Sequence, residues 1–231
     1  MEIADNIKII DLALYINKKI LVISDTHIGY EEALNKQGIL VPRLHFKDLV
    51  KRLEKILSRT KPKVIVINGD IKHEFSKISE QEWRETLKVV ELLAKNCDEL
   101  FLIKGNHDTV LGPIAKKRNI KLMDKYITED IIILHGDMVP KVIKEKTIII
   151  GHEHPAVSIQ TKTRKEKYKC FLKGSFKGKT LIVMPSFNLL TEGTDIKEER
   201  TLSPFLKQDL SDFEVYIVGD KLYNFGKLKN L

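Results

Sequence analysis

The stretch VIVINGDIKH, residues 64–73, decides the fold, because an apolar run ends directly before a set of polar side chains. Val64–Ile67 has the length and the β-branched composition of a buried strand. Gly69, Asp70 and His73 follow where that strand would emerge into a loop. Because open α/β sheets bind ligands beyond the carboxyl ends of their strands, this stretch predicts a strand that delivers functional side chains.

Comparable clusters recur along the chain, and together they hold six of its seven histidines. Four of the five clusters directly follow an apolar run. The clusters are Asp25-Thr26-His27, Gly69-Asp70 with His73, Gly105-Asn106-His107-Asp108, His135-Gly136-Asp137 and Gly151-His152-Glu153-His154. Carboxylate and imidazole suit Zn, Mn or Fe, and two metals that share one carboxylate form a clamp suited to in-line attack at phosphorus. One histidine after a strand is most often an ordinary loop residue, but the whole set indicates a two-metal hydrolase.

The first half of the chain alternates strands and helices. Residues 44–58 and 79–94 show apolar positions at helical spacing, and each segment lies between two apolar runs. Ser79 and Glu82 form a capping box at the start of the second helix. Trp83 lies on the apolar face of that helix, where core packing is favoured over base stacking. Two β-α-β units are therefore predicted, preceded by a hairpin whose strands are residues 7–15 and 19–24.

After Asp124 the pattern consists mostly of strands. We expect them at residues 131–134, 147–150, 156–161, 168–172, 180–184, 215–218 and 221–225. Residues 197–212 match no element. Helices in the first half and strands in the second indicate an α/β protein with two packed sheets and helices outside them.

Composition predicts one domain over residues 1–231, with metal-binding motifs in 20–155 and a strand-rich part in 156–231. The chain is 42% hydrophobic and 31% charged, enough to bury one substantial core, and no Pro/Gly/Ser-rich linker divides it. No apolar stretch approaches the roughly 18 residues of a membrane span, and the N-terminus lacks a secretory pattern. We therefore expect a cytoplasmic location and no membrane partner.

The net charge of +8 indicates an anionic partner. Seven lysines and one arginine gather in residues 162–179, with Glu166 as the only acid there. Two interpretations remain open. The segment is a solvated sheet edge, where lysines prevent pairing with other chains, or it is a rim that follows a phosphate backbone.

The five clusters resemble, in order, the motifs of the calcineurin-like metallophosphoesterases: Asp-x-His, Gly-Asp-x-x-His, Gly-Asn-His-Asp, a strand-end His and Gly-His-x-His. At the positions of His73 and Asp108, the phosphoprotein phosphatases of the superfamily carry other residues. At these two positions the chain resembles the SbcD-type repair nucleases and their small archaeal relatives. Cys170-Phe171 and Met184-Pro185-Ser186-Phe187 resemble the compact phosphoesterases encoded beside bacterial DNA ligases and helicases. The resemblance implies a four-layer α/β/β/α sandwich of two mixed sheets flanked by helices.

The same resemblance implies residue roles. One metal would be held by Asp25, His27, Asp70 and His154, and the second by Asp70, Asn106, His135 and His152. Asp70 would be the shared carboxylate. His107 would contact the phosphate or protonate the leaving oxygen, with Asp108 as the acceptor that orients it, and His73 would orient the scissile phosphate.

The implied cofactors are two divalent ions, with Mn²⁺ expected in the cell and Zn²⁺, Fe²⁺ or Ni²⁺ compatible with the same ligands. The expected activity is phosphodiester hydrolysis in single-stranded or end-bearing DNA or RNA, for DNA repair or other nucleic-acid processing. A helicase or ligase partner is implied by the resemblance. Two alternatives stay open: a small-molecule phosphatase or cyclic-nucleotide phosphodiesterase, and a noncatalytic scaffold.

Overall fold

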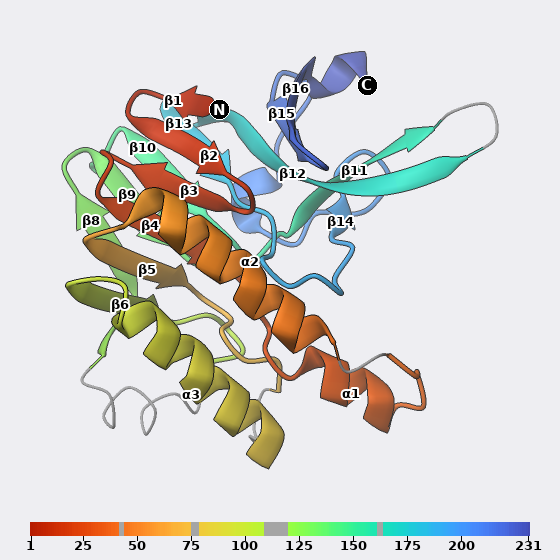
Figure 1. Ribbon diagram of the computed structural model, residues 1–231. Helices are drawn as coiled ribbons and strands as arrows, with labels where there is room; N and C mark the ends of the chain where they lie inside the picture. The colour runs from red at the N-terminus through yellow and green to blue at the C-terminus, as the bar shows by residue number, and fades with distance from the viewer. Residues whose placement is uncertain (42–43, 75–78, 109–119, 161–163) are drawn as a thin grey trace.

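The strand that leads to Asp70 lies inside a seven-stranded mixed sheet. The computed structural model describes residues 1–41, 44–74, 79–108, 120–160 and 164–231 (Figure 1). In the first sheet, β1 to β4 pair antiparallel and β4 to β7 pair parallel. The strands, in spatial order, are β1 (Glu2–Ala4), β2 (Ile7–Ile10), β3 (Ala13–Ile16), β4 (Ile20–Ser24), β5 (Val64–Asn68), β6 (Glu99–Ile103) and β7 (Lys121–Met123).

Two helices connect the parallel strands, as predicted. α2 (His45–Thr60) links β4 to β5, and α3 (Glu80–Ala94) links β5 to β6; a shorter helix, α1 (Tyr30–Lys36), precedes α2. The hydroxyl of Ser79 caps α3 by accepting from the N–H of Glu82 at 3.0 Å. The Glu82 carboxylate accepts from the N–H of His73 at 2.9 Å, so the cap of α3 also fixes the loop after β5.

Within the described residues, the second sheet has nine strands. Its centre is parallel, since β10 pairs in parallel with both β9 and β13. The strands are β8 (Lys125–Thr128), β9 (Ile131–Leu134), β10 (Thr147–Ile150), β11 (Pro155–Gln160), β12 (Lys165–Phe176), β13 (Lys179–Val183), β14 (Thr194–Asp195), β15 (Glu214–Val218) and β16 (Leu222–Lys227).

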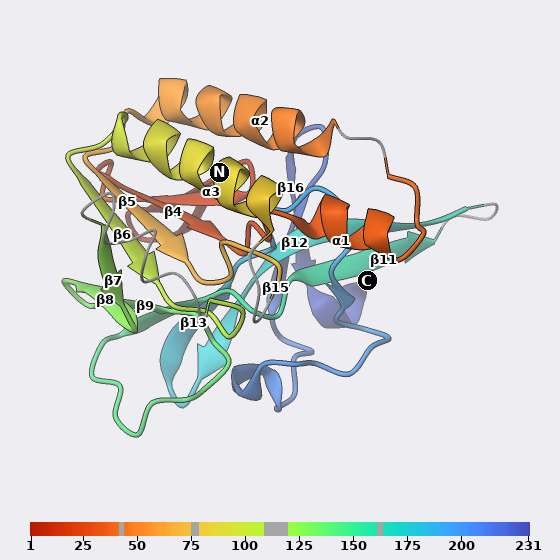
Figure 2. The ribbon, with the colours of Figure 1, turned by 90° about the horizontal axis from the view of Figure 1, so that it is seen from below.

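Alternating apolar side chains pack the layers together. Ile65 and Ile67 of β5 face the cluster that includes α2 and α3, which cover one side of the first sheet (Figures 1 and 2). Val64 and Val66 face a second cluster, shared with Ile149 and other residues of the second sheet. Trp83 is partly buried against the first cluster, so the core interpretation is confirmed. Each central strand is thus apolar on both faces, as a buried parallel strand must be.

The predicted class, an α/β fold of two packed mixed sheets, is confirmed. The outer face of the second sheet is covered, within the described residues, by the chain from Ile196 to Phe213, which includes the 3₁₀ helix η1 (Pro204–Leu206). Phe205 is completely buried there. Residues 197–212, for which the sequence predicted no helix or strand, lie in this segment. The segment is mostly irregular, so its buried side chains follow neither a helical nor a strand period. A second 3₁₀ helix, η2 (Leu228–Asn230), ends the fold.

Some predicted elements were wrong in extent. Residues 7–15 form two strands, because the chain reverses at Asp11, whose φ of 60° places it in the left-handed region that Asp tolerates. β12 runs from Lys165 to Phe176 and is much longer than the predicted 168–172. The sequence analysis missed α1, β1, β7, β8 and β14, which are short. In the described part of the chain, no helix has the length and apolar character needed to cross a membrane.

Candidate metal centre

All seven predicted metal ligands lie at one edge of the two sheets. β4, β5 and β6 are in parallel register, with Ser24 beside Asn68 and Asn68 beside Ile103, so their carboxyl ends coincide. β9 and β10 also end together, with Leu134 beside Ile150. Each motif begins one to three residues after its strand, and the parallel register therefore gathers five distant segments at one place.

Six of the predicted ligands form two groups of three, and a third group among the described residues joins His27 to His73 and His107. Asp25, His27 and His154 make one group, and Asp70, His135 and His152 make the other; within each, the ligand atoms lie within 4.8 Å of one another. The Nε2 atoms of His27 and His154 are 3.3 Å apart. In the second group, His135 Nε2 lies 3.2 Å from His152 Nδ1 and 3.0 Å from Asn106 Oδ1. These two groups fall within the two ligand sets that the resemblance implied, and the assignment of a metal ion to each set stays a prediction.

Asp70 stands between the two groups. Its Oδ2 lies 3.8 Å from His27 Nε2 and 3.5 Å from His135 Nε2. Its Oδ1 accepts the backbone N–H of His107 at 2.9 Å, which fixes the orientation of the carboxylate. One carboxylate oxygen therefore faces an imidazole from each group.

The ligand loops adopt a backbone conformation that non-glycine residues rarely take. The residues Asp25, His27, Asp70, His152 and His154 all have φ between 39° and 62°. Such strain costs of order 1–3 kcal/mol per residue and persists where the surroundings enforce it, typically at functional sites. Tight left-handed turns let each loop direct its side chain back over the sheet edge.

Three motif glycines make room for the ligands. A Cβ atom at Gly69 would lie 2.0 Å from the His135 ring, and one at Gly105 would lie 2.1 Å from Asp70 Oδ1. At Gly151 it would lie 2.4 Å from Asp25 Oδ2. No real Cβ contact is that short, so only glycine lets the backbone approach these side chains.

Burial disfavours the protonated form of three ligand imidazoles. It lowers the pKa of His27 and His135, and it lowers the pKa of His152 to about 4. Burial and the charge of Asp25 raise the pKa of Asp70 to about 8. For Asp25 itself burial acts in the raising direction, but the imidazoles of His154, His135 and His27 outweigh it and hold its pKa well below the ordinary value.

These residues fit divalent metal ions. Among the described residues, the buried Asp25 Oδ1 has no hydrogen-bond partner, although it faces the imidazoles of His135 and His154 at 3.6 Å. A buried polar atom without a partner is costly, and a cation would supply the missing interaction. Neutral imidazole, carboxylate and amide oxygen form a mixed N/O set that suits Mn, Fe and Zn.

Metal binding is expected to displace a proton from Asp70. At pH 7 its raised pKa of about 8 leaves this carboxyl protonated in the metal-free protein, whereas burial disfavours the protonated form of His27, His135 and His152. A cation needs the carboxylate, so binding should release about one proton at pH 7 and tighten as the pH rises toward 8. Calorimetric titration with Mn²⁺ in buffers of different ionisation enthalpy measures this release. Equal heats in all buffers at pH 7 would contradict the expectation.

The predicted catalytic histidines lie beside the first ligand group. The ring centroid of His107 is 5.1 Å from that of His27, and the ring centroid of His73 is 5.7 Å from each of them. His107 Nδ1 lies 2.5 Å from the carbonyl oxygen of His73, so Nδ1 is the donor in this contact. Tyr30, which the sequence analysis missed, packs on His73 with ring centroids 4.5 Å apart.

Asp108 makes backbone contacts that were not predicted. Its carboxylate accepts from the backbone N–H groups of Ile71 at 3.2 Å and Gly105 at 3.0 Å. It therefore ties the loop after β5 to the loop after β6, while the carbonyl of His73 holds Nδ1 of His107. The expected orientation of His107 by Asp108 stays a prediction beside these observed contacts. Glu153, which neither implied ligand set includes, accepts from the N–H groups of Leu202 and Ser203.

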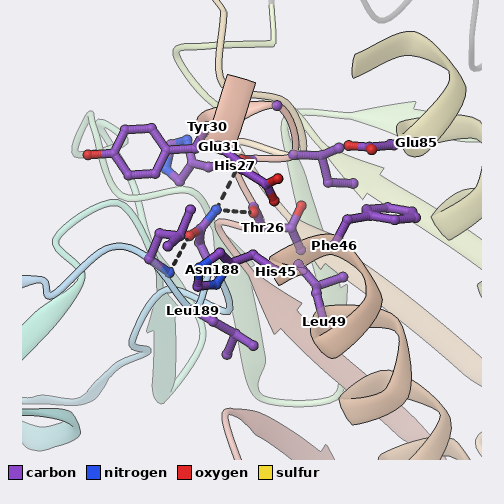
Figure 3. Close-up of a pocket in the computed structure, with 13 residues that line it drawn as sticks. Thr26, His27, Tyr30, Glu31, His45, Phe46, Leu49, Glu85, Asn188 and Leu189 are labelled. Atoms are coloured by element: carbon purple, nitrogen blue, oxygen red, sulfur yellow. Dashed lines mark hydrogen bonds between the residues drawn. The ribbon is translucent and has the colours of Figure 1, made fainter. Parts of the chain in front are cut away.

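A buried loop after β13 supports the Asp25-Thr26-His27 backbone. Asn188 donates through its amide to the carbonyls of Thr26 at 2.9 Å and His27 at 3.0 Å (Figure 3). Ser186 donates to the carbonyl of Asp25 at 2.6 Å. The ammonium group of Lys169 in turn donates to the carbonyls of Ser186 and Asn188. Ser186 belongs to the run Met184-Pro185-Ser186-Phe187, but the sequence does not show which residues this run contacts.

Removing this support is expected to weaken metal binding. Asn188→Ala leaves the carbonyls of Thr26 and His27 without their donor, so the loop loses its fixed conformation, and affinity for Mn²⁺ should fall about 10- to 100-fold. Competition with a fluorescent chelator measures the affinity, and circular dichroism checks folding. Asn96→Ala is the control, because Asn96 donates to the carbonyl of Leu92 on α3. An unchanged affinity in a folded Asn188→Ala variant would refute the role.

The crevice beside this loop is too narrow for a substrate. Its wall includes His27, Tyr30, Phe46 and Leu189 (Figure 3), and its volume is about 30 Å³. That volume admits a water molecule or two. His45, the histidine outside the five clusters, is the first residue of α2 and lines the same crevice half-buried.

The basic segment is largely neutralised within the fold. Lys165 contacts Glu198 at 2.5 Å, and Lys167 contacts Glu199 at 2.7 Å. Lys169 is occupied by the carbonyls described above, and Lys162 lies outside the described residues. The acids come from the chain after β14, which the local charge count could not include. These contacts favour the solvated-edge interpretation over a phosphate-binding rim.

Comparison with known proteins agrees with the geometry. In fold the chain is similar to the nuclease MPE of Pseudomonas putida, with a TM-score of 0.68 and 19% identity over 93% of this chain and 92% of that one. It also matches the phosphoesterase Yfce of E. coli, with a TM-score of 0.43 and 11% identity over 90% and 97% of the two chains. No curated protein sequence matches. The model of the calcineurin-like phosphoesterases matches residues 18–212, which include every predicted ligand, and the chain belongs to this family of metal-dependent phosphoesterases.

Proposed function

We propose that this chain is a dinuclear-metal phosphodiesterase that cuts single-stranded or end-bearing nucleic acid. The observation that carries the proposal is the position of Asp70, whose Oδ2 faces His27 at 3.8 Å and His135 at 3.5 Å. A carboxylate so placed can be shared by two cations. Two cations that share a ligand suit an in-line displacement at phosphorus.

The ligand assignment follows the two observed groups. One ion would be held by Asp25, His27, Asp70 and His154, and the other by Asp70, Asn106, His135 and His152. The ions would supply Lewis-acid stabilisation of the charge that develops on the phosphoryl oxygens and would acidify a water molecule. Mn²⁺ is the proposed ion in the cell, because mixed N/O ligation accepts Mn, Fe and Zn alike and availability then decides.

The remaining residues hold the substrate and move a proton. His107 is placed to contact the phosphate or to protonate the leaving oxygen through Nε2, because Nδ1 is held by the His73 carbonyl. His73 lies beside it and orients the phosphate. Asp108 keeps the loops that carry both histidines in place.

Three observations support a polynucleotide as the substrate. The chain carries a net charge of +8, which suits a polyanion. His73 stands in the position that resembles the nuclease branch of the family. The fold is similar to that of a Pseudomonas putida nuclease over almost the whole of both chains.

A substrate panel tests the proposal. The Mn²⁺-loaded protein would be assayed with labelled single-stranded and duplex DNA and RNA, with cyclic nucleotides and with an aryl phosphodiester. Cleavage of single strands, lost on chelation and restored by Mn²⁺, is the expected result. Turnover of cyclic nucleotides or small esters with no cleavage of any polynucleotide would identify a small-molecule enzyme, and no turnover of any substrate would favour a noncatalytic scaffold.

A further inference from the structure

A large cleft opens next to the metal centre, on the side away from the crevice of Figure 3. Its volume is about 560 Å³, and its inner end is lined by Gly105 and by the predicted ligand His135. Its outer wall includes residues 137–141, part of the loop between β9 and β10, which projects from the body near β8 (Figure 2). The cleft is thus continuous with the second ligand group and large enough for a nucleotide-sized group.

Three lysines line this cleft: Lys104, Lys125 and Lys141. Lys104 follows the last residue of β6, and Lys125 is the register partner of Leu134, the residue before His135. All three residues are exposed. The strand ends that deliver metal ligands therefore also place two of these cations beside the centre.

Two carboxylates share the cleft, but they leave the lysines available. Asp124 lies 3.6 Å from Lys104, and because both side chains are well exposed, the ion pair is worth little. Asp137 lies toward the inner end, where its charge acts on Asp70 and His135. Divalent ions in the adjoining groups would outweigh this single negative charge. These lysines differ from Lys165 and Lys167, each held at 2.7 Å or less by a glutamate.

The loop also presents apolar side chains to solvent. Met138, which lines the cleft, is 72% exposed, and Val142, farther along the loop, is 66% exposed. Apolar side chains next to cations complement a single strand, whose unpaired bases have free faces and whose phosphates are anionic. In a duplex the base faces are stacked on one another and cannot make this contact.

We propose that this cleft guides a single strand to the metal centre, with phosphates at Lys104, Lys125 and Lys141 and an unpaired base against Met138. The inference rests on the proposed function and locates its polynucleotide path. It places that path along the β9–β10 loop and away from the basic segment of residues 162–179.

Charge-removing variants test the path. The triple variant Lys104→Gln, Lys125→Gln, Lys141→Gln should raise KM for a single-stranded oligonucleotide about tenfold and flatten the slope of log KM against log salt by roughly 2, from about 0.7 per lost phosphate contact. Met138→Ser should raise KM for single strands about fivefold and leave duplex KM unchanged. Hydrolysis of an aryl phosphodiester should be unaffected in both variants.

Two controls separate the possible failures. The triple variant Lys8→Gln, Lys19→Gln, Lys63→Gln removes three exposed lysines from β2 and from the residues just before β4 and β5, distant from the ligand edge, and should keep wild-type KM and salt slope. Wild-type protein that cleaves no polynucleotide would overturn the proposed function itself. If wild type cleaves single strands but the cleft variants match it, or if their aryl-ester kinetics change equally, the path proposed here is wrong. If the double variant Lys165→Gln, Lys167→Gln raises KM for single strands more than the triple cleft variant does, the strand runs along the basic segment instead.

Discussion

Replacing Asp70 with Asn is expected to abolish hydrolysis and to reduce the bound metal below two equivalents. Asp70 Oδ2 faces an imidazole of each ligand group, at 3.8 Å from His27 Nε2 and 3.5 Å from His135 Nε2. An amide keeps the size and can still accept the N–H of His107, but it removes the negative charge that two cations would share. A rate loss of about 10³-fold or more is therefore expected. Metal analysis after gel filtration, with kcat on an aryl phosphodiester, measures both effects.

Glu153→Gln is the matched control for Asp70→Asn. Glu153 is completely buried and lies between two predicted ligands in sequence, and its Oε2 accepts from the backbone N–H groups of Leu202 and Ser203, a role that the Gln amide oxygen can retain. This variant should bind two metal ions and keep wild-type turnover. An Asp70→Asn protein with two full equivalents and normal turnover would refute the shared-ligand assignment.

Much of the fold and the site could be predicted because the information is local. β5 and the Gly69-Asp70 turn are consecutive in the chain, so an apolar run and the polar residues after it identify a strand end without any knowledge of tertiary structure. The same holds for β4 before Asp25 and for β6 before Asn106. The motif glycines can also be recognised from the local sequence. The reason that glycine is needed at position 69 is a tertiary contact, because Gly69 lies against His135, sixty-six positions away.

The parts that could not be predicted depend on contacts between distant segments. Asn188 bonds the carbonyls of Thr26 and His27 across more than 160 residues, and no periodicity signals such a bond. From the sequence, the positive charge of residues 162–179 looked available to bind a phosphate backbone. The acids that pair with Lys165 and Lys167, Glu198 and Glu199, are remote in sequence. Short strands such as β7 contain too few residues to show alternation and owe their pairing to a neighbour.

Removal of the His107 side chain should leave both metals bound while kcat falls by about 10² to 10⁴, the usual contribution of a positioned proton donor. The imidazole is held by the His73 carbonyl at Nδ1, and the contact between its backbone N–H and Asp70 survives in His107→Ala. Burial lowers the pKa of His107, so in the free protein the ring is mostly neutral at pH 7. If it acts as a proton donor, the wild-type rate should fall as the pH rises through that lowered pKa, and the variant should lose this dependence.

The leaving group separates a proton donor from a phosphate contact. A nitrophenyl ester needs little protonation, so His107→Ala should slow it much less than an alkyl phosphodiester or a nucleotide linkage if Nε2 donates the proton. Equal losses on all substrates would assign His107 to binding the phosphate, and loss of metal together with activity would make it a ligand. His45→Ala is the control, because His45 is the histidine outside the motif clusters and belongs to none of the ligand groups found in the described residues. Its kcat should stay within about twofold of wild type, the range in which surface substitutions leave function intact.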